Sequence, residues 1–181
     1  MTSDTRYSGP GPCGPDPFGG LPAALRDIAY SAARHPGTVS PDGPSPDSGG
    51  GPDLSAGANC QLYAYAVLRH HGLLAPPLRS SDLWADTAAT RRVAVARPLD
   101  LVLFDGGPVP GRPAAYGAHV GVHLGPDRVL HLCKEAGRPA VWRYADFAAR
   151  PRYARLVGIK RVVRRVAEGE REPRAGDGPA S

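Results

Sequence analysis

The sequence contains few cysteines and no long hydrophobic run, and both absences limit what the protein can be. Its three cysteines, Cys13, Cys60 and Cys133, form no C-x-x-C pair. The chain therefore lacks both the ligand spacing of a zinc site and the even set of thiols of a disulfide framework. No stretch approaches the roughly 18 uninterrupted apolar residues of a membrane-spanning helix. We expect free thiols, no bound metal and no membrane partner.

The first 20 residues also lack the basic-then-apolar order of a secretory signal. They are rich in Gly, Pro, Ser and Asp, and so few apolar groups do not offset the entropy of ordering a chain. We therefore expect a cytoplasmic protein with disordered tails at residues 1–20 and 167–181. With 181 residues, 41% of them hydrophobic, the remainder predicts one domain at 21–166, with a Pro/Gly-rich loop at 35–54.

The net charge of +5 does not by itself predict a nucleic-acid partner. Most of the basic residues lie between Arg150 and Arg165, where they alternate with apolar residues and indicate a strand with a solvated face. Neither aromatic stacking residues nor a known binding motif accompanies them. The Gly-rich segments at 49–51 and 106–107 also lack the context of a phosphate loop. We expect no nucleic-acid partner and no cofactor.

Apolar spacing and turn residues predict a mixed α+β domain. Helical spacing is found in three segments and short apolar runs bounded by turn residues in five. The predicted helices are 21–34, 59–72 and 81–90, and the predicted strands are 99–104, 119–124, 128–133, 141–144 and 155–166. The strands on either side of Gly125-Pro126-Asp127 form the pattern of an antiparallel hairpin.

The residues of a cysteine hydrolase are present, because Cys60 falls in the first turn of a predicted helix and two histidines lie on the predicted hairpin. A helix N-terminus favours negative charge and is expected to lower the pKa of a thiol there. His119 and His131 lie on neighbouring strands, so one imidazole could stand behind the other. Spacing alone leaves the alternative of a packed cysteine and two structural histidines.

Four motifs occur in a fixed order along residues 56–166. They are Asn59-Cys60-Gln61-Leu62-Tyr63-Ala64-Tyr65-Ala66, Leu99-Asp100-Leu101-Val102-Leu103-Phe104, His119-Val120-Gly121-Val122-His123-Leu124-Gly125 and Val129-Leu130-His131-Leu132. This series resembles the NlpC/P60 cysteine peptidases, as does the segment 155–162. The resemblance implies a papain-like domain in which the helix bearing the nucleophile packs on a central antiparallel sheet. It also implies Cys60 as nucleophile, His119 as base and His131 as orienting residue.

The sequence departs from that family around the nucleophile, where D-C-S-G is replaced by Asn59-Cys60-Gln61-Leu62, and before the first strand, where Gly-Asp is replaced by Leu99-Asp100. These departures concern the walls of the substrate cleft. We therefore predict substrate contacts from Asn59, Gln61, Asp100, His123 and Trp84, with core packing as the alternative for Trp84. Cys133 is the alternative thiol.

The predicted reaction is hydrolysis of an amide or peptide bond through a thioester with Cys60. The expected substrate is a small intracellular peptide or biosynthetic intermediate, since no export signal or wall-binding module is seen. Three alternatives stay open: acyl transfer on the same triad, cleavage of peptidoglycan peptides, and a catalytically silent binding domain. The oligomeric state is left open.

Overall fold

The computed structural model of this protein describes residues 18, 20–37 and 52–163. The C-terminal tail predicted at 167–181 lies outside these residues, as do most of the N-terminal tail at 1–20 and most of the loop at 35–54. The described helices are α1 (Ala23–Arg26), α2 (Cys60–His70), α3 (Ser80–Ala85) and α4 (Tyr144–Ala148), with one 3₁₀ turn, η1 (Pro151–Tyr153). None of these helices combines the length and apolar character needed to cross a bilayer.

Six strands form one antiparallel sheet in the order β1-β6-β2-β3-β4-β5. The strands are β1 (Thr90–Val93), β2 (Leu101–Asp105), β3 (His119–Gly125), β4 (Arg128–Leu132), β5 (Pro139–Trp142) and β6 (Arg155–Val162). The predicted hairpin is present as β3 and β4, with Val122 opposite Leu130. The protein is therefore a mixture of helices and antiparallel sheet, as the sequence predicted.

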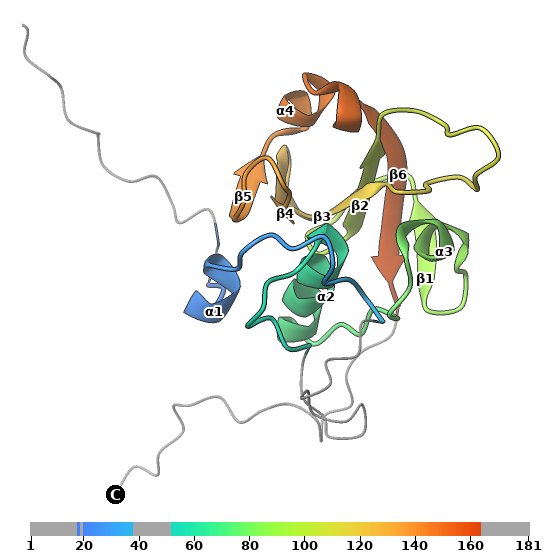
Figure 1. The fold of residues 1–181 in the computed structure, drawn as a ribbon. Coiled ribbons are helices and arrows are strands. Elements are labelled where there is room, and N and C mark those ends of the chain that lie inside the picture. The colour runs from blue at the N-terminus through green and yellow to red at the C-terminus, as the bar shows by residue number, and fades with distance from the viewer. Residues whose placement is uncertain (1–17, 19, 38–51, 164–181) are drawn as a thin grey trace, which may run out of the picture.

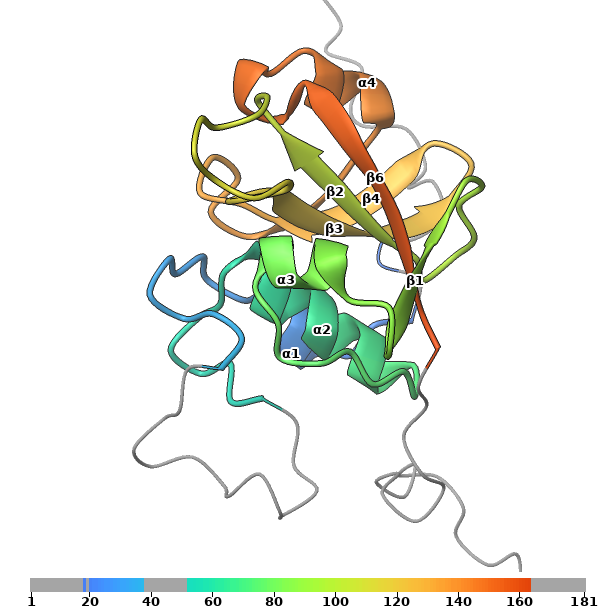
Figure 2. The same ribbon diagram turned by 90° about the vertical axis from the view of Figure 1, so that its right-hand side faces the viewer.

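The sheet is covered on both faces, with α1, α2 and α3 on one side and α4 on the other (Figures 1 and 2). Successive side chains of a strand point to opposite faces, and β2 shows the result. Leu101 and Leu103 belong to the core on the α2 side, whereas Val102 and Phe104 pack with Phe147 of α4. All five residues of β2 are buried, which explains why its sequence is a nearly continuous apolar run.

Helix α2 is the main cover of the sheet and packs against β3 and β4. Its inward face is apolar, and Tyr63, Ala64, Val67 and Leu68 are buried. The helix ends at His70, before Gly72, whose φ of +75° suits glycine. This agrees closely with the helix predicted at 59–72.

Two helix predictions were too long. The helix predicted at 21–34 is confined to Ala23–Arg26, because the following backbone pairs with distant segments instead of continuing the helix. The Tyr30 N–H donates to Gly137 O at 2.9 Å, and the Ser31 N–H donates to Ala58 O at 2.8 Å. The helix predicted at 81–90 ends at Ala85. The Asp86 carboxylate then accepts hydrogen bonds from the N–H groups of Ala89 and Thr90, and β1 begins at Thr90.

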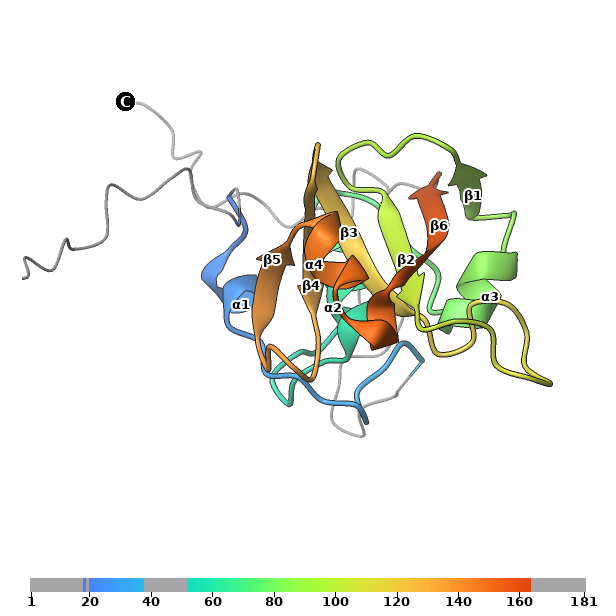
Figure 3. The ribbon, with the colours of Figure 1, turned by 90° about the horizontal axis from the view of Figure 1, so that it is seen from above.

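The predicted C-terminal strands also differ in extent. Strand β5 ends at Trp142, and Tyr144, which was assigned to that strand, instead begins α4. The last strand ends at Val162 rather than at residue 166. Neither α4 nor η1 was predicted, because each is shorter than two helical turns and shows no periodic pattern. Seen from above, α4 and η1 lie over the sheet near β2 and β4 (Figure 3).

Candidate active site

Cys60 is the first residue of α2, and the residue before it caps the helix. The side-chain oxygen of Asn59 accepts a hydrogen bond of 2.8 Å from the Leu62 N–H, which satisfies one of the free donors of the first turn. Because α2 packs against β3, its first turn brings the half-buried Cys60 next to the start of that strand. The capped helix end therefore fixes where the thiol lies.

The electrostatic setting of Cys60 differs from the prediction. Burial raises the pKa of the Cys60 thiol. The backbone N–H groups of Val120, Gln61 and Cys60 itself favour the thiolate and lower the pKa, but they do not offset the loss of hydration. The backbone N–H groups at the helix N-terminus therefore act in the predicted direction, but burial outweighs them and the pKa of Cys60 is raised. At neutral pH Cys60 is a thiol.

His119 and His131 form a hydrogen-bonded pair across the β3–β4 hairpin. The distance from His119 Nε2 to His131 Nδ1 is 3.0 Å, and the two rings are nearly perpendicular. His119 is 6% exposed and His131 is 0% exposed. The hairpin therefore places one imidazole behind the other, the arrangement that sequence spacing left open.

Both histidines are neutral at pH 7. Burial lowers the pKa of His131 to about 3, with a smaller contribution from the positive charge of Arg150. Burial also lowers the pKa of His119 well below its ordinary value, and repulsion from Arg152, and from His131 once that ring is protonated, acts in the same direction. A neutral His119 can accept a proton, as a general base must.

His131 is held in an aromatic pocket on the α4 side of the sheet. Its ring centroid lies 4.2 Å from that of Trp142 and 4.9 Å from that of Phe147, both in T-shaped contacts. Its Nε2 is buried and has no hydrogen-bond partner among the described residues. Gly121 leaves room for this packing, since a Cβ there would lie 2.5 Å from Val129 Cγ1 and 3.4 Å from His131 Cβ.

A cavity of about 180 Å³ brings the predicted nucleophile and base together. Cys60 and His119 both line it, as do Asn59 and Gln61, two of the predicted substrate-contacting residues. Among the described residues no hydrogen bond joins Cys60 to His119. The side-chain nitrogen of Gln61 is occupied within the protein, donating to Tyr65 Oη at 2.9 Å and to Leu78 O at 2.7 Å.

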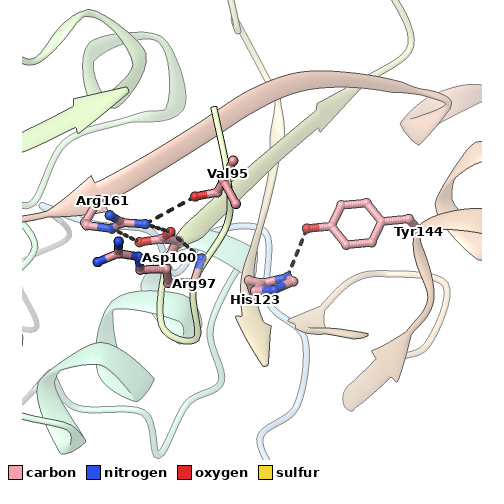
Figure 4. Close-up of polar contacts among 6 residues, drawn as sticks. All are labelled: Val95, Arg97, Asp100, His123, Tyr144 and Arg161. Atoms are coloured by element: carbon pink, nitrogen blue, oxygen red, sulfur yellow. Dashed lines mark hydrogen bonds and ion pairs between the residues drawn. The ribbon is translucent and has the colours of Figure 1, made fainter. Parts of the chain in front are cut away.

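The three other predicted substrate contacts do not line this cavity, and Figure 4 shows two of them in separate interactions. Asp100 is buried and accepts two hydrogen bonds from the Arg161 guanidinium, at 2.8 and 2.7 Å. The His123 ring lies 3.1 Å from Tyr144 Oη on α4. Asp100 and His123 are therefore engaged elsewhere in the fold, and their contact with a substrate stays a prediction.

Trp84 also makes its contacts outside the cavity. Its indole ring fills the space above Gly158 of β6, where an added Cβ would lie 2.5 Å from the ring. The Arg92 guanidinium stacks 4.2 Å from the indole ring. These contacts match the core-packing alternative that the sequence left for this residue.

The structure also brings residues to the cavity that the sequence did not indicate as site residues. Tyr30 comes from the segment after α1, and Tyr153 from η1. Cys133, the alternative thiol, lines the same cavity but is only 1% exposed, and its sulfur accepts a hydrogen bond of 3.4 Å from the Ala136 N–H. No local sequence signal could have found the tyrosines, because distant segments of the fold bring them there.

Within the described residues, no group of three or more His, Cys, Asp or Glu side chains is arranged to hold a metal ion. The cavity is lined by a thiol and a neutral imidazole, and a second imidazole is hydrogen-bonded to the first. Such a set can carry nucleophilic catalysis by an activated cysteine.

Comparison with known proteins gave matches to solved structures, whereas no family model and no curated protein matches the chain. One match is a NlpC/P60 family protein from Bacillus cereus ATCC 10987, with 17% identity and a TM-score of 0.44 over 60% of this chain. Another is the NlpC/p60 domain of the peptidoglycan hydrolase SagA, with 22% identity and a TM-score of 0.37 over 55% of this chain. The structural neighbours are NlpC/P60 proteins.

The family that the sequence resembles and the family named for these two solved structures are the same. The chain spans 32% of the length of the Bacillus cereus protein and 77% of the SagA domain.

Proposed function

We propose that this protein is a papain-like cysteine hydrolase of the NlpC/P60 type that cleaves an amide or peptide bond with Cys60, His119 and His131. The observation that carries the proposal is the shared cavity of Cys60 and His119, with His131 hydrogen-bonded to His119 from behind at 3.0 Å. The order of nucleophile, base and orienting group is that of a cysteine hydrolase triad.

The hydrogen bond between the two histidines is consistent with one proton arrangement that permits catalysis. If His119 Nε2–H donates to His131 Nδ1, then His119 Nδ1 carries a lone pair and can accept the proton of Cys60. The single proton of His131 is then on Nε2, the buried atom without a hydrogen-bond partner. Aromatic rings attract N–H groups, and the rings of Trp142 and Phe147 beside His131 favour this arrangement.

In the proposed reaction the Cys60 sulfur attacks the amide carbonyl carbon while its proton passes to His119. The Cys60 backbone N–H helps to stabilise the oxyanion, as backbone donors do in acyl transfer. His119 then donates the proton to the leaving amine, the C–N bond breaks and a thioester remains. Water, deprotonated by His119, hydrolyses the thioester and restores the thiol.

The substrate that we propose is small. The cavity, at about 180 Å³, is below the roughly 300–1,000 Å³ of pockets for drug-sized ligands. It therefore suits about one residue of a short peptide or of a biosynthetic intermediate. Because one structural neighbour is the domain of a peptidoglycan hydrolase, wall peptides belong in the same test panel.

The proposal is tested with a panel of short peptides, wall-peptide fragments and chromogenic anilides. Cys60→Ala and His119→Ala should abolish release of the amine. In the unmodified protein, the tryptic peptide that contains Cys60 should gain the mass of the acyl group. Cys133→Ala is the matched control, because it removes the other described thiol, and it should keep both activity and acylation. Turnover that survives in Cys60→Ala, or acylation found on Cys133, would refute the proposal.

A further inference from the structure

Three cations line the cavity and come from different parts of the fold. Arg79 precedes α3, Lys134 follows β4 and Arg152 lies in η1. All three side chains belong to exposed residues. None of the three forms an ion pair with a carboxylate in the part of the chain that the structure describes.

Among the described residues, no acidic residue lines the cavity alongside these cations. Two acidic groups close to these cations in the fold, Glu135 and Asp105, are paired with other arginines. Glu135, adjacent to Lys134, accepts a hydrogen bond of 2.8 Å from Arg150. Asp105 is held by Arg155 at 2.7 Å. The cavity therefore combines three positive charges with no compensating negative charge from the described chain.

The charge of Arg152 influences the pKa values of groups that line the cavity. Its positive charge is one of the influences that lower the pKa of His119, and it also acts to lower the pKa of Tyr30 and Tyr153 on the cavity wall. An anion bound beside Arg152 would offset this effect and make His119 a stronger base. Binding of a negative group would thus be coupled to the readiness of the base.

We propose that the cavity selects amides that carry a carboxylate near the scissile carbonyl and disfavours those that carry a free ammonium group there. This selectivity deepens the proposed hydrolase function and rests on it. A cleft lined by charges of one sign concentrates ligands of the opposite sign. Guanidinium groups pair with planar carboxylates through two parallel hydrogen bonds, so Arg79 and Arg152 are suited to bind one.

The first experiment needs no knowledge of the natural substrate. Cys60 is alkylated with iodoacetate, iodoacetamide or 2-bromoethylammonium, and the rate of each reaction is followed by the mass of the Cys60 peptide. Free cysteine gives the reference rates. The ratio of the iodoacetate rate to the iodoacetamide rate should be at least about tenfold higher at Cys60 than at free cysteine. The ratio should fall when salt is raised from 0.05 to 0.5 M, since salt screens exposed charges.

The matched variants each remove three positive charges. The combination of Arg79→Gln, Lys134→Gln and Arg152→Gln should bring the rate ratio to that of free cysteine. In the control, the exposed residues Arg91, Arg97 and Arg128, which do not line the cavity, are changed to Gln, and the ratio should stay within about twofold of that of the unmodified protein. Thermal melting confirms that both variants are folded.

The second experiment uses three anilides of nearly equal size, in which the acyl group is succinyl, butyryl or β-alanyl. The expected order of kcat/KM is succinyl, then butyryl, then β-alanyl. The proposed selectivity would be overturned by any of three results. These are an iodoacetate-to-iodoacetamide rate ratio that is equal at Cys60 and free cysteine, a ratio that the cavity substitutions leave unchanged, and no labelling of Cys60 by any reagent. Strong anion preference in labelling without hydrolysis of any amide would instead overturn the hydrolase function and leave the selectivity in place.

Discussion

Replacing Asp100 with asparagine should destabilise the protein strongly and leave its chemistry intact. The Asp100 carboxylate is 2% exposed and accepts hydrogen bonds from Arg161 Nε at 2.8 Å, Arg161 Nη2 at 2.7 Å and the Arg97 N–H at 2.7 Å. This bidentate pair joins the segment before β2 to β6 (Figure 4). Asparagine has one carbonyl oxygen and no charge, so it does not reproduce the pair.

The size of the effect follows from the burial of the two partners. Breaking a buried ion pair from one side costs about 3–5 kcal/mol. The Arg161 side chain is 19% exposed and also donates a hydrogen bond to Val95 O. Both features reduce the free-energy penalty of leaving Arg161 without its carboxylate partner. We therefore expect a loss near the lower limit, about 3 kcal/mol. For a domain of this size that corresponds to a fall in Tm of roughly 10 °C.

The assay compares thermal melts and kcat/KM of Asp100→Asn with those of Asp82→Asn, an exposed carboxylate in the first turn of α3. The control should melt within about 3 °C of the unmodified protein, since a first-turn carboxylate contributes at most about 1 kcal/mol. Well below its Tm, Asp100→Asn should keep kcat/KM within about threefold. A large loss of kcat/KM at unchanged Tm would show that Asp100 contacts the substrate after all.

Four further predictions concern the site itself. His131→Ala should lower kcat/KM by up to about ten-thousand-fold, as for other orienting residues, whereas His131→Asn should retain more because its amide can still bond to His119; equal kinetics for His131→Ala and the unmodified protein would reduce the site to a dyad. The acid limb of the pH profile of kcat/KM should lie below pH 6.5, because burial lowers the pKa of His119, and a limb above pH 7 would contradict this. The pKa of His131 is about 3 in the folded protein and higher in the unfolded chain. Its contribution to stability is therefore complete above pH 6.5 and is lost as the pH falls toward 3. Between these pH values the Tm of the unmodified protein should decline more than the Tm of His131→Asn. Gly121→Ala should cost about 1–3 kcal/mol by overpacking and should also lower kcat, measured by melting and turnover together. Gly111→Ser has open space but a φ of +71°, so it should lower Tm through backbone strain and affect turnover little.

Much of the local structure followed from the sequence. The amphipathic run at 59–72 predicted a helix with Cys60 in its first turn, and apolar runs around Gly125-Pro126-Asp127 predicted the β3–β4 hairpin. The signals were strong because each depends on neighbours within one helix or hairpin. The helix predicted at 21–34 failed because its backbone hydrogen bonds go to Gly137 and Ala58, and sequence periodicity contains no information about such distant partners.

The chemistry of the candidate site divides in the same way. The order of Cys60, His119 and His131 along the chain was enough to predict which residue types could react. Only the tertiary structure decided which of them meet, because the 3.0 Å contact of the histidines depends on strand pairing and on the space at Gly121.

The tertiary structure alone also decided the charges at the site. The helix N-terminus predicted a lowered thiol pKa, but burial of Cys60 raises it, and loss of hydration depends on every segment that packs around the sulfur. For the same reason the fold decided that Asp100 pairs with Arg161 and that Arg79, Lys134 and Arg152 meet around one cavity. A sequence specifies which groups are available, whereas their hydration and their neighbours are properties of the packed chain.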